Sequence, residues 1–136
     1  MLQRVTWTPL YSLGHDVLDA QHQRLIALAN ELADHCRSES DTAAEQRFDH
    51  AFAAFKVLVR EHLDTEASLL AGADPANAED LEAEREEFDT FAGEVATTAH
   101  FDREELQRFV AVWCIGHLNA AVQARRAAPA GDDAVS

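Results

Sequence analysis

The sequence predicts an all-α protein, an up-down-up-down antiparallel four-helix bundle with an N-terminal arm. Three observations predict this fold. The 136 residues are rich in alanine, leucine, glutamate and arginine but include only five glycines and three prolines, a composition that favours helices. Apolar residues recur at alternating intervals of three and four along four segments, which is the helical period. Short connections join the segments, and they force neighbouring helices to run in opposite directions.

The helices are expected over residues 16–37, 42–70 and 78–98 and from Asp102 onward, after an arm with Trp7 and Tyr11. Asp41 and Asp102 are expected to cap the second and fourth helices. The buried faces of the first two helices are predicted to carry Leu18, His22, Leu25, Ala29, Leu32, Cys36, Phe48, Phe52, Phe55, Val59, His62, Glu66 and Leu69. Those of the last two are predicted to carry Leu81, Arg85, Phe88, Ala92, Val95, Leu106, Val110, Trp113, His117, Ala120 and Ala124.

Composition and charge indicate which kinds of partner the protein binds and where in the cell it is expected. Residues 1–128 are expected to form one domain, and residues 129–136 a disordered tail. A net charge of −14 argues against nucleic acid and anionic membrane surfaces, and no segment is long and apolar enough to cross a membrane. Two cysteines and an N-terminus without a signal-peptide pattern indicate a cytoplasmic protein. The expected partners are a small ligand or a metal ion, with a protein partner as a further option.

The segment REHLDTE, residues 60–66, places a histidine and a glutamate in line with a row of phenylalanines. His62 and Glu66 are four residues apart and share a helix face, where an unpaired charge costs several kcal/mol. His22 and His117 lie on the other helices at a matched depth, within roughly 5 to 10 Å along the bundle. Imidazole and carboxylate together bind iron, zinc, copper or manganese. The four residues therefore predict a metal or polar-ligand site, and the alternative is that each is hydrogen-bonded locally.

The motifs around these residues resemble those of bacterial hemerythrins. The resemblance covers about residues 7 to 122 and rests on the Trp7 arm, D-x-Q-H ending at His22, H-x-x-x-E from His62 to Glu66, and W-x-x-x-H ending at His117. It implies a four-helix bundle with a dinuclear iron centre that binds oxygen reversibly, for storage, delivery or sensing. It also implies that His22 and His62 bind one iron, that Glu66 bridges, and that His117 binds the other iron.

The resemblance is incomplete on the side of the second iron. The family's histidine pair on the third helix falls on Leu81 and Arg85, and its second bridging carboxylate falls on Val122. The sequence therefore predicts one metal ion, with iron first and zinc or another transition metal as alternatives, and a dinuclear iron centre is less expected. Acidic substitutes are available on the third helix, but they are interpreted as a solvated face: Glu82, Glu84 and Glu86.

Two further residues are predicted to bind the cofactor. Arg85 stands where the resemblance expects an iron ligand, and its guanidinium could replace part of the lost positive charge by pairing with Glu66. Cys114 lies three residues before His117 on the same face and could supply a soft ligand, although a buried cysteine more often only packs.

Three functions follow from these residues. The first is a hemerythrin-like metal-binding protein with a remodelled, mononuclear site that binds a metal ion and a small ligand such as oxygen. The second is a metal-free structural or interaction protein in which an Arg85–Glu66 pair replaces the metal. The third is an enzyme of unknown substrate, whose single metal ion activates oxygen or water while Arg85 holds an anionic substrate. An enzyme is less expected than a binding protein.

Overall fold

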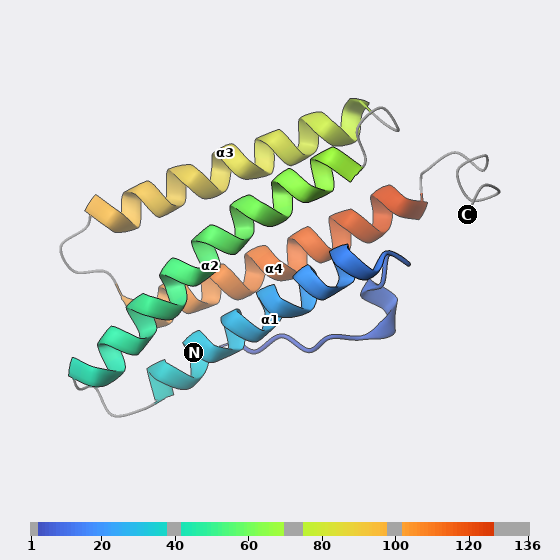
Figure 1. Ribbon diagram of the computed structural model, residues 1–136. Coiled ribbons are helices and arrows are strands. Elements are labelled where there is room, and N and C mark those ends of the chain that lie inside the picture. The colour runs from blue at the N-terminus through green and yellow to red at the C-terminus, as the bar shows by residue number, and fades with distance from the viewer. Residues whose placement is uncertain (1–2, 38–41, 70–74, 98–101, 127–136) are drawn as a thin grey trace.

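The computed structural model describes residues 3–37, 42–69, 75–97 and 102–126. Its elements are a short 3-10 helix, η1, and four α-helices: η1 (Pro9–Tyr11), α1 (Asp16–Arg37), α2 (Thr42–Leu69), α3 (Pro75–Thr97) and α4 (Arg103–Arg126). Successive α-helices run in opposite directions (Figure 1), which confirms the predicted antiparallel bundle. Over these four ranges, no helix has the length and apolarity needed to cross a membrane.

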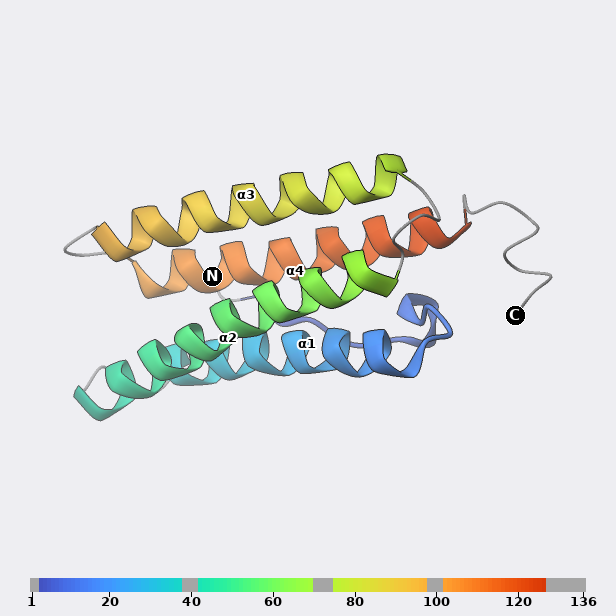
Figure 2. The same ribbon diagram turned by 45° about the horizontal axis from the view of Figure 1, so that its top comes forward.

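The four helices surround one shared core. α1 packs against α2 and α4, and α2 also packs against α3. Turning the molecule places α3 beside α4 (Figure 2), and aromatic rings join these two helices. Phe91 of α3 stacks on Phe109 of α4 with ring centroids 3.6 Å apart, and Phe88 meets Trp113 with centroids 5.3 Å apart.

The helix limits follow the predicted ones closely, with one difference at α3. This helix begins at Pro75, three residues before the expected start, because proline needs no hydrogen-bond partner in the first helical turn. Asp102 caps α4 as predicted, since its Oδ1 accepts from the backbone N–H groups of Glu104 and Glu105 over 2.9 and 3.3 Å. The predicted cap Asp41 and the tail 129–136 lie outside the described residues.

Most predicted core positions are buried, but Arg85, Ala92 and Trp113 are only half-buried, and further differences lie near helix ends. Leu69 is 48% exposed, because it is the last residue of α2. In the last turns of α4, Leu118 and Ala121 are buried, while the predicted Ala120 is exposed. The helical period of 3.6 residues lies between three and four, so either neighbour satisfies the sequence pattern.

The N-terminal arm is held between α1 and α4 by two side-chain amides. Asn30 of α1 accepts from the backbone N–H of Val5 and donates to its carbonyl, both over 2.9 Å. Gln107 of α4, fully buried, bonds the backbone N–H and carbonyl of Gln3 in the same way. The arm thereby covers an apolar cluster formed by Val5, Trp7, Tyr11, Ile26, Ala111, Ile115 and Leu118.

Truncating the aromatic centre of the bundle tests the packing. Phe55 is fully buried and its ring contacts Phe88 and Trp113. Phe55→Ala is expected to lower the free energy of unfolding by about 3–5 kcal/mol through lost burial and a residual cavity. Urea unfolding followed by circular dichroism measures this loss. Val57→Ala, on the exposed face of the same helix, is the control, and equal losses for both variants would contradict the packing described.

Candidate metal centre

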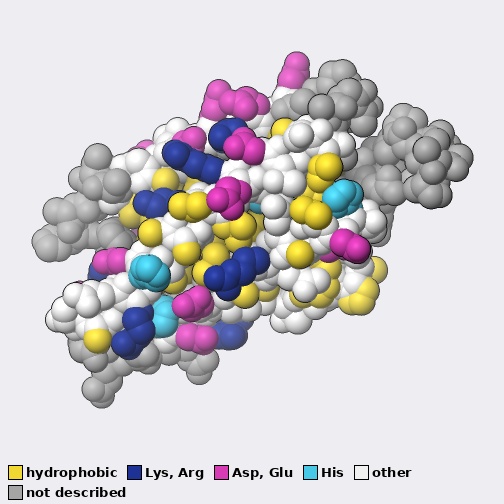
Figure 3. Space-filling view, in the orientation of Figure 1, with side chains coloured by type: hydrophobic (Ala, Val, Ile, Leu, Met, Phe, Trp, Pro, Cys, Tyr) yellow, Lys and Arg dark blue, Asp and Glu magenta, His cyan; other side chains and the backbone are white. Residues whose placement is uncertain are grey.

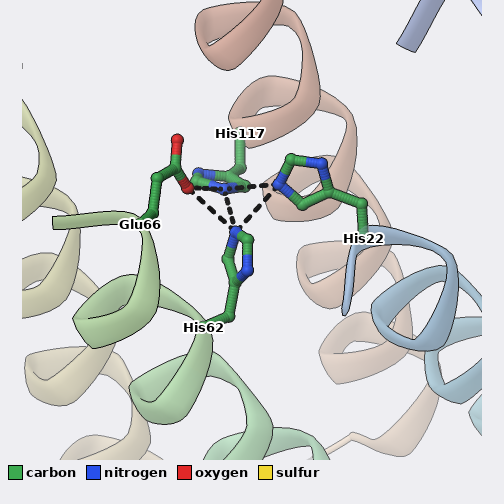
Figure 4. A group of neighbouring side chains, drawn as sticks. All are labelled: His22, His62, Glu66 and His117. Carbon is green, nitrogen blue, oxygen red and sulfur yellow. Dashed lines mark hydrogen bonds and ion pairs between the residues drawn. The ribbon is translucent and has the colours of Figure 1, made fainter. Parts of the chain in front are cut away.

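Four polar side chains from three helices meet inside the bundle. His22 comes from α1, His62 and Glu66 from successive turns of α2, and His117 from α4 (Figure 4). All four are buried, with exposed fractions from 0% to 4%. One ligand atom from each lies within 4.8 Å of the others. The structure thus brings together the four residues predicted from the sequence, and they could hold a metal ion.

The distances between the donor atoms match those of ligands around one ion. The Nε2 atom of His62 lies 2.8 Å from that of His22 and 2.9 Å from that of His117, and the Nε2 atoms of His22 and His117 are 3.3 Å apart. Glu66 Oε2 lies 2.9 Å from Nε2 of His62 and 3.2 Å from Nε2 of His117. Neighbouring ligands at about 2.0–2.1 Å from a metal stand roughly 2.8–3.4 Å apart, for angles between 90° and the tetrahedral angle.

The orientation of the Glu66 carboxylate supports the same interpretation. Its Oε2 is buried and has no hydrogen-bond partner, although two ring nitrogens lie within 3.2 Å of it. The distances are therefore those of close ion pairs. This is the arrangement expected of donor atoms that point at a common centre.

A chain of hydrogen bonds determines which nitrogen of His62 carries the proton. The Thr65 hydroxyl donates to the Glu61 carbonyl over 2.8 Å, so its oxygen is left to accept from the Gln21 amide nitrogen, 3.4 Å away. That contact turns Gln21 Oε1 toward His62, whose Nδ1 donates to it over 2.8 Å. When the ring is neutral, its Nε2 therefore carries a lone pair that faces the other three donors.

His117 is held in the same manner by a residue of α3. Its Nδ1 donates to Oε2 of Glu84 over 2.6 Å, since a carboxylate can only accept. When both rings are neutral, His62 and His117 therefore turn two lone pairs toward each other across 2.9 Å. Such a contact requires a cation between the nitrogens, either a metal ion or a proton.

Glu82 and Glu86 are exposed, as the interpretation of a solvated face expects, but the position of Glu84 corrects that interpretation for the residue between them. Leu81 and Phe88 are both buried, and a residue three or four places after Leu81 can lie between them on the same face. The spacing predicts Arg85 on this buried face, whereas the structure turns Glu84 toward His117. Reasoning from the sequence therefore missed Glu84, which bonds His117, and also Gln21, which bonds His62. The one sequence signal for Gln21 is that it directly precedes His22.

The predicted pair between Arg85 and Glu66 is wrong. Both guanidinium Nη atoms of Arg85 donate to the carboxylate of Asp64, and the two side chains are 34% and 58% exposed. Acidic and basic side chains lie next to one another on this face of α2 and α3 (Figure 3). The long Arg85 side chain keeps its charge in water there and avoids the desolvation that a pair with buried Glu66 would cost.

The structure does not bring Cys114 into the cluster either. Its thiol is directed at the backbone carbonyl of Leu25, 4.0 Å away, and burial raises the pKa of the thiol to about 12. Leu81 is buried and Val122 is half-buried where the resemblance expects ligands of a second iron. Within the part of the chain that the structure describes, the cluster around His62 is the one group of three or more donors close enough to share an ion.

Burial and the charges of neighbouring groups give the three histidines and Glu66 very different pKa shifts. Burial, then the charges of the neighbouring rings, lowers the pKa of His22 to about 3, and burial also lowers the pKa of His62. Burial would lower the pKa of His117 too, but contacts with Glu66 and Glu84 outweigh it and raise the pKa to about 9. For Glu66, burial opposes ionisation, yet its contacts with His117 and His62 hold the pKa well below its ordinary value. Without a metal, His117 is therefore the charged ring.

In the metal-free protein, the free energy of unfolding is expected to peak near the ordinary histidine pKa of 6.5. Below it, the unfolded chain binds protons at His22 and His62 that the folded protein does not, so stability falls on acidification. Above it, folded His117 keeps a proton that the unfolded chain has lost, so stability falls as the pH rises through about 9. Urea unfolding of chelator-treated protein at a series of pH values measures both limbs.

Two histidine variants separate this effect from a general pH response. His117→Ala is expected to remove the alkaline decline in the free energy of unfolding, because the group that keeps its proton is gone. His50→Ala replaces an exposed histidine of α2 and should leave both limbs in place. Metal-free stability that stays constant from pH 6.5 to 9 would show that His117 does not hold its proton as described.

Comparisons with known proteins do not identify a family for this chain. No family model matches it, and neither does any curated protein or solved structure. Its function is therefore inferred from the buried cluster of His22, His62, Glu66 and His117 and from the side chains that hold its rings.

Proposed function

We propose that the protein is a hemerythrin-like metal-binding protein that holds one metal ion through His22, His62, Glu66 and His117. The observation that carries the proposal is the convergence of three Nε2 atoms and one carboxylate oxygen within 4.8 Å, all buried. Neutral imidazoles and a carboxylate are costly to bury unpaired. A cation at their centre satisfies all four at once, and hydrogen bonds from Nδ1 hold the rings of His62 and His117 with Nε2 inward.

One ion is favoured over two by the residues around the cluster. Leu81 offers no donor atom, and Arg85 pairs with Asp64 at the surface, so the side of the site where the resemblance expects a second iron has lost its ligands. His117 instead directs its Nε2 at the same point as His22 and His62. The proposed site therefore has three histidines and one carboxylate around a single ion.

The donor set suits iron, zinc or manganese, and iron is our first choice because of the resemblance to bacterial hemerythrins. An ion that prefers five or six ligands keeps a position open beyond the four protein donors, and a small ligand such as oxygen could bind there. Zinc in a tetrahedral site would have its coordination completed by the protein. The ion's identity thus decides whether the protein also binds a small ligand.

Metal content per chain tests the proposal directly. Elemental mass spectrometry on untagged protein is expected to find about one ion per chain, and His62→Ala should reduce this to nearly none because the ring lies at the centre of the cluster. His50→Ala, in an exposed position of the same helix, is the control. A metal present at a hundred times its Kd should also stabilise the fold by about 2.7 kcal/mol.

The other outcomes are equally informative. About two ions per chain would contradict the mononuclear site and support a dinuclear centre with substitute ligands. No metal, in protein incubated with iron, zinc and manganese salts, would contradict metal binding altogether. Equal metal content in His62→Ala and His50→Ala would place the ion elsewhere on the chain.

A further inference from the structure

Two of the three histidines in the cluster have different partners on their outer nitrogens. His117 donates to the carboxylate of Glu84 over 2.6 Å, whereas His62 donates to the neutral amide of Gln21 over 2.8 Å. The two bonds are alike in geometry, since both leave the proton on Nδ1 and turn Nε2 inward. They differ in charge, and this difference has a consequence for the ion that the site accepts.

We propose that Glu84 is a specificity-determining residue that matches the charge of the site to a divalent cation. The inference rests on the proposed function. Neutral rings contribute no charge, Glu66 contributes −1 directly, and Glu84 contributes −1 through the ring of His117, so the total of −2 balances an ion of charge +2. In a buried layer an unbalanced charge is costly, so this sum selects the charge of the ion.

Of the nearby charges on the described residues, Asp19 acts on His22, but its carboxylate accepts hydrogen bonds from Ser12 and Leu13 and is not among the four donors. Arg85, next to Glu84 in the chain, is paired with Asp64 at the surface, so its positive charge is compensated there. Gln21 is held in place by Thr65 and offers only an amide oxygen to His62. A carboxylate that accepts from a metal-bound histidine also makes that ring a stronger donor. Glu84 therefore acts on the ion through His117 without touching it.

A reciprocal exchange of the two partners tests the role of charge. Glu84→Gln keeps an oxygen that can accept from His117 but removes the charge, and it is expected to weaken Zn²⁺ binding about 10–100-fold. Gln21→Glu adds a charge behind His62 and raises the total to −3, so it should shift the preference of the site from Zn²⁺ toward Fe³⁺. Competition with a chelator of known affinity measures both. Glu86→Gln, at an exposed position of α3, is the control for loss of an acidic residue.

A redox readout distinguishes charge from orientation. In iron-loaded protein, Glu84→Gln is expected to raise the midpoint potential, because Fe³⁺ loses more stabilisation than Fe²⁺ when a negative charge is removed. Gln21→Glu is expected to lower it, and the double variant Glu84→Gln with Gln21→Glu should return it toward the wild-type value. A purely structural role would move neither potential in this opposed way. Circular dichroism of the metal-free variants verifies that each remains folded.

The measurements distinguish a failure of the proposed function from a failure of the inference about Glu84. A wild-type protein that binds neither zinc nor iron overturns the proposed function and this inference with it. A wild-type protein that binds zinc, with single variants that move the midpoint potential of iron in the same direction, overturns the inference alone and leaves the metal site standing. Unchanged zinc affinity in Glu84→Gln would likewise overturn it, because the removed charge would then make no difference to the ion.

Discussion

The burial of three imidazoles and a carboxylate in one layer is the constraint on which the rest of this structure depends. Their donor atoms lie within 4.8 Å of one another in an otherwise apolar bundle, and burial disfavours charge on each group separately. The ion-pair distances between Glu66 and the rings show that the groups depend on one another. Either a shared proton or a shared metal ion must supply the positive charge in the middle.

Different helices of the bundle contribute different parts of this layer. α1, α2 and α4 each supply side chains that could bind the ion, while Glu84 of α3 bonds the outer nitrogen of His117. The hemerythrin resemblance expects α3 to bring two histidines of its own. Under the proposed function, this helix has exchanged ligands for a single carboxylate that acts through a ring, which is consistent with one ion in place of two.

Desolvation explains which charged residues enter the core and which remain outside. Glu66 is buried where two rings meet its carboxylate, so its charge is compensated locally. Arg85 had no such partner inside and extends to Asp64 at the surface. A long side chain reaches solvent at little cost, whereas a shorter glutamate one residue earlier stays close to His117. The two neighbours on α3 have thus taken the opposite places from those that the sequence pattern suggested.

The sequence by itself determined the all-α bundle, the helix limits to within three residues, and the shared depth of His22, His62, Glu66 and His117, because helical periodicity and chain length depend on local order alone. Only the tertiary structure decided the partners of these residues. Spacings of three and four both suit a helix face, so the pattern did not choose between Glu84 and Arg85, and Gln21 carried no periodic signal. Packing against α1, α2 and α4 made that choice by setting the rotation of each helix and the access of each charge to water.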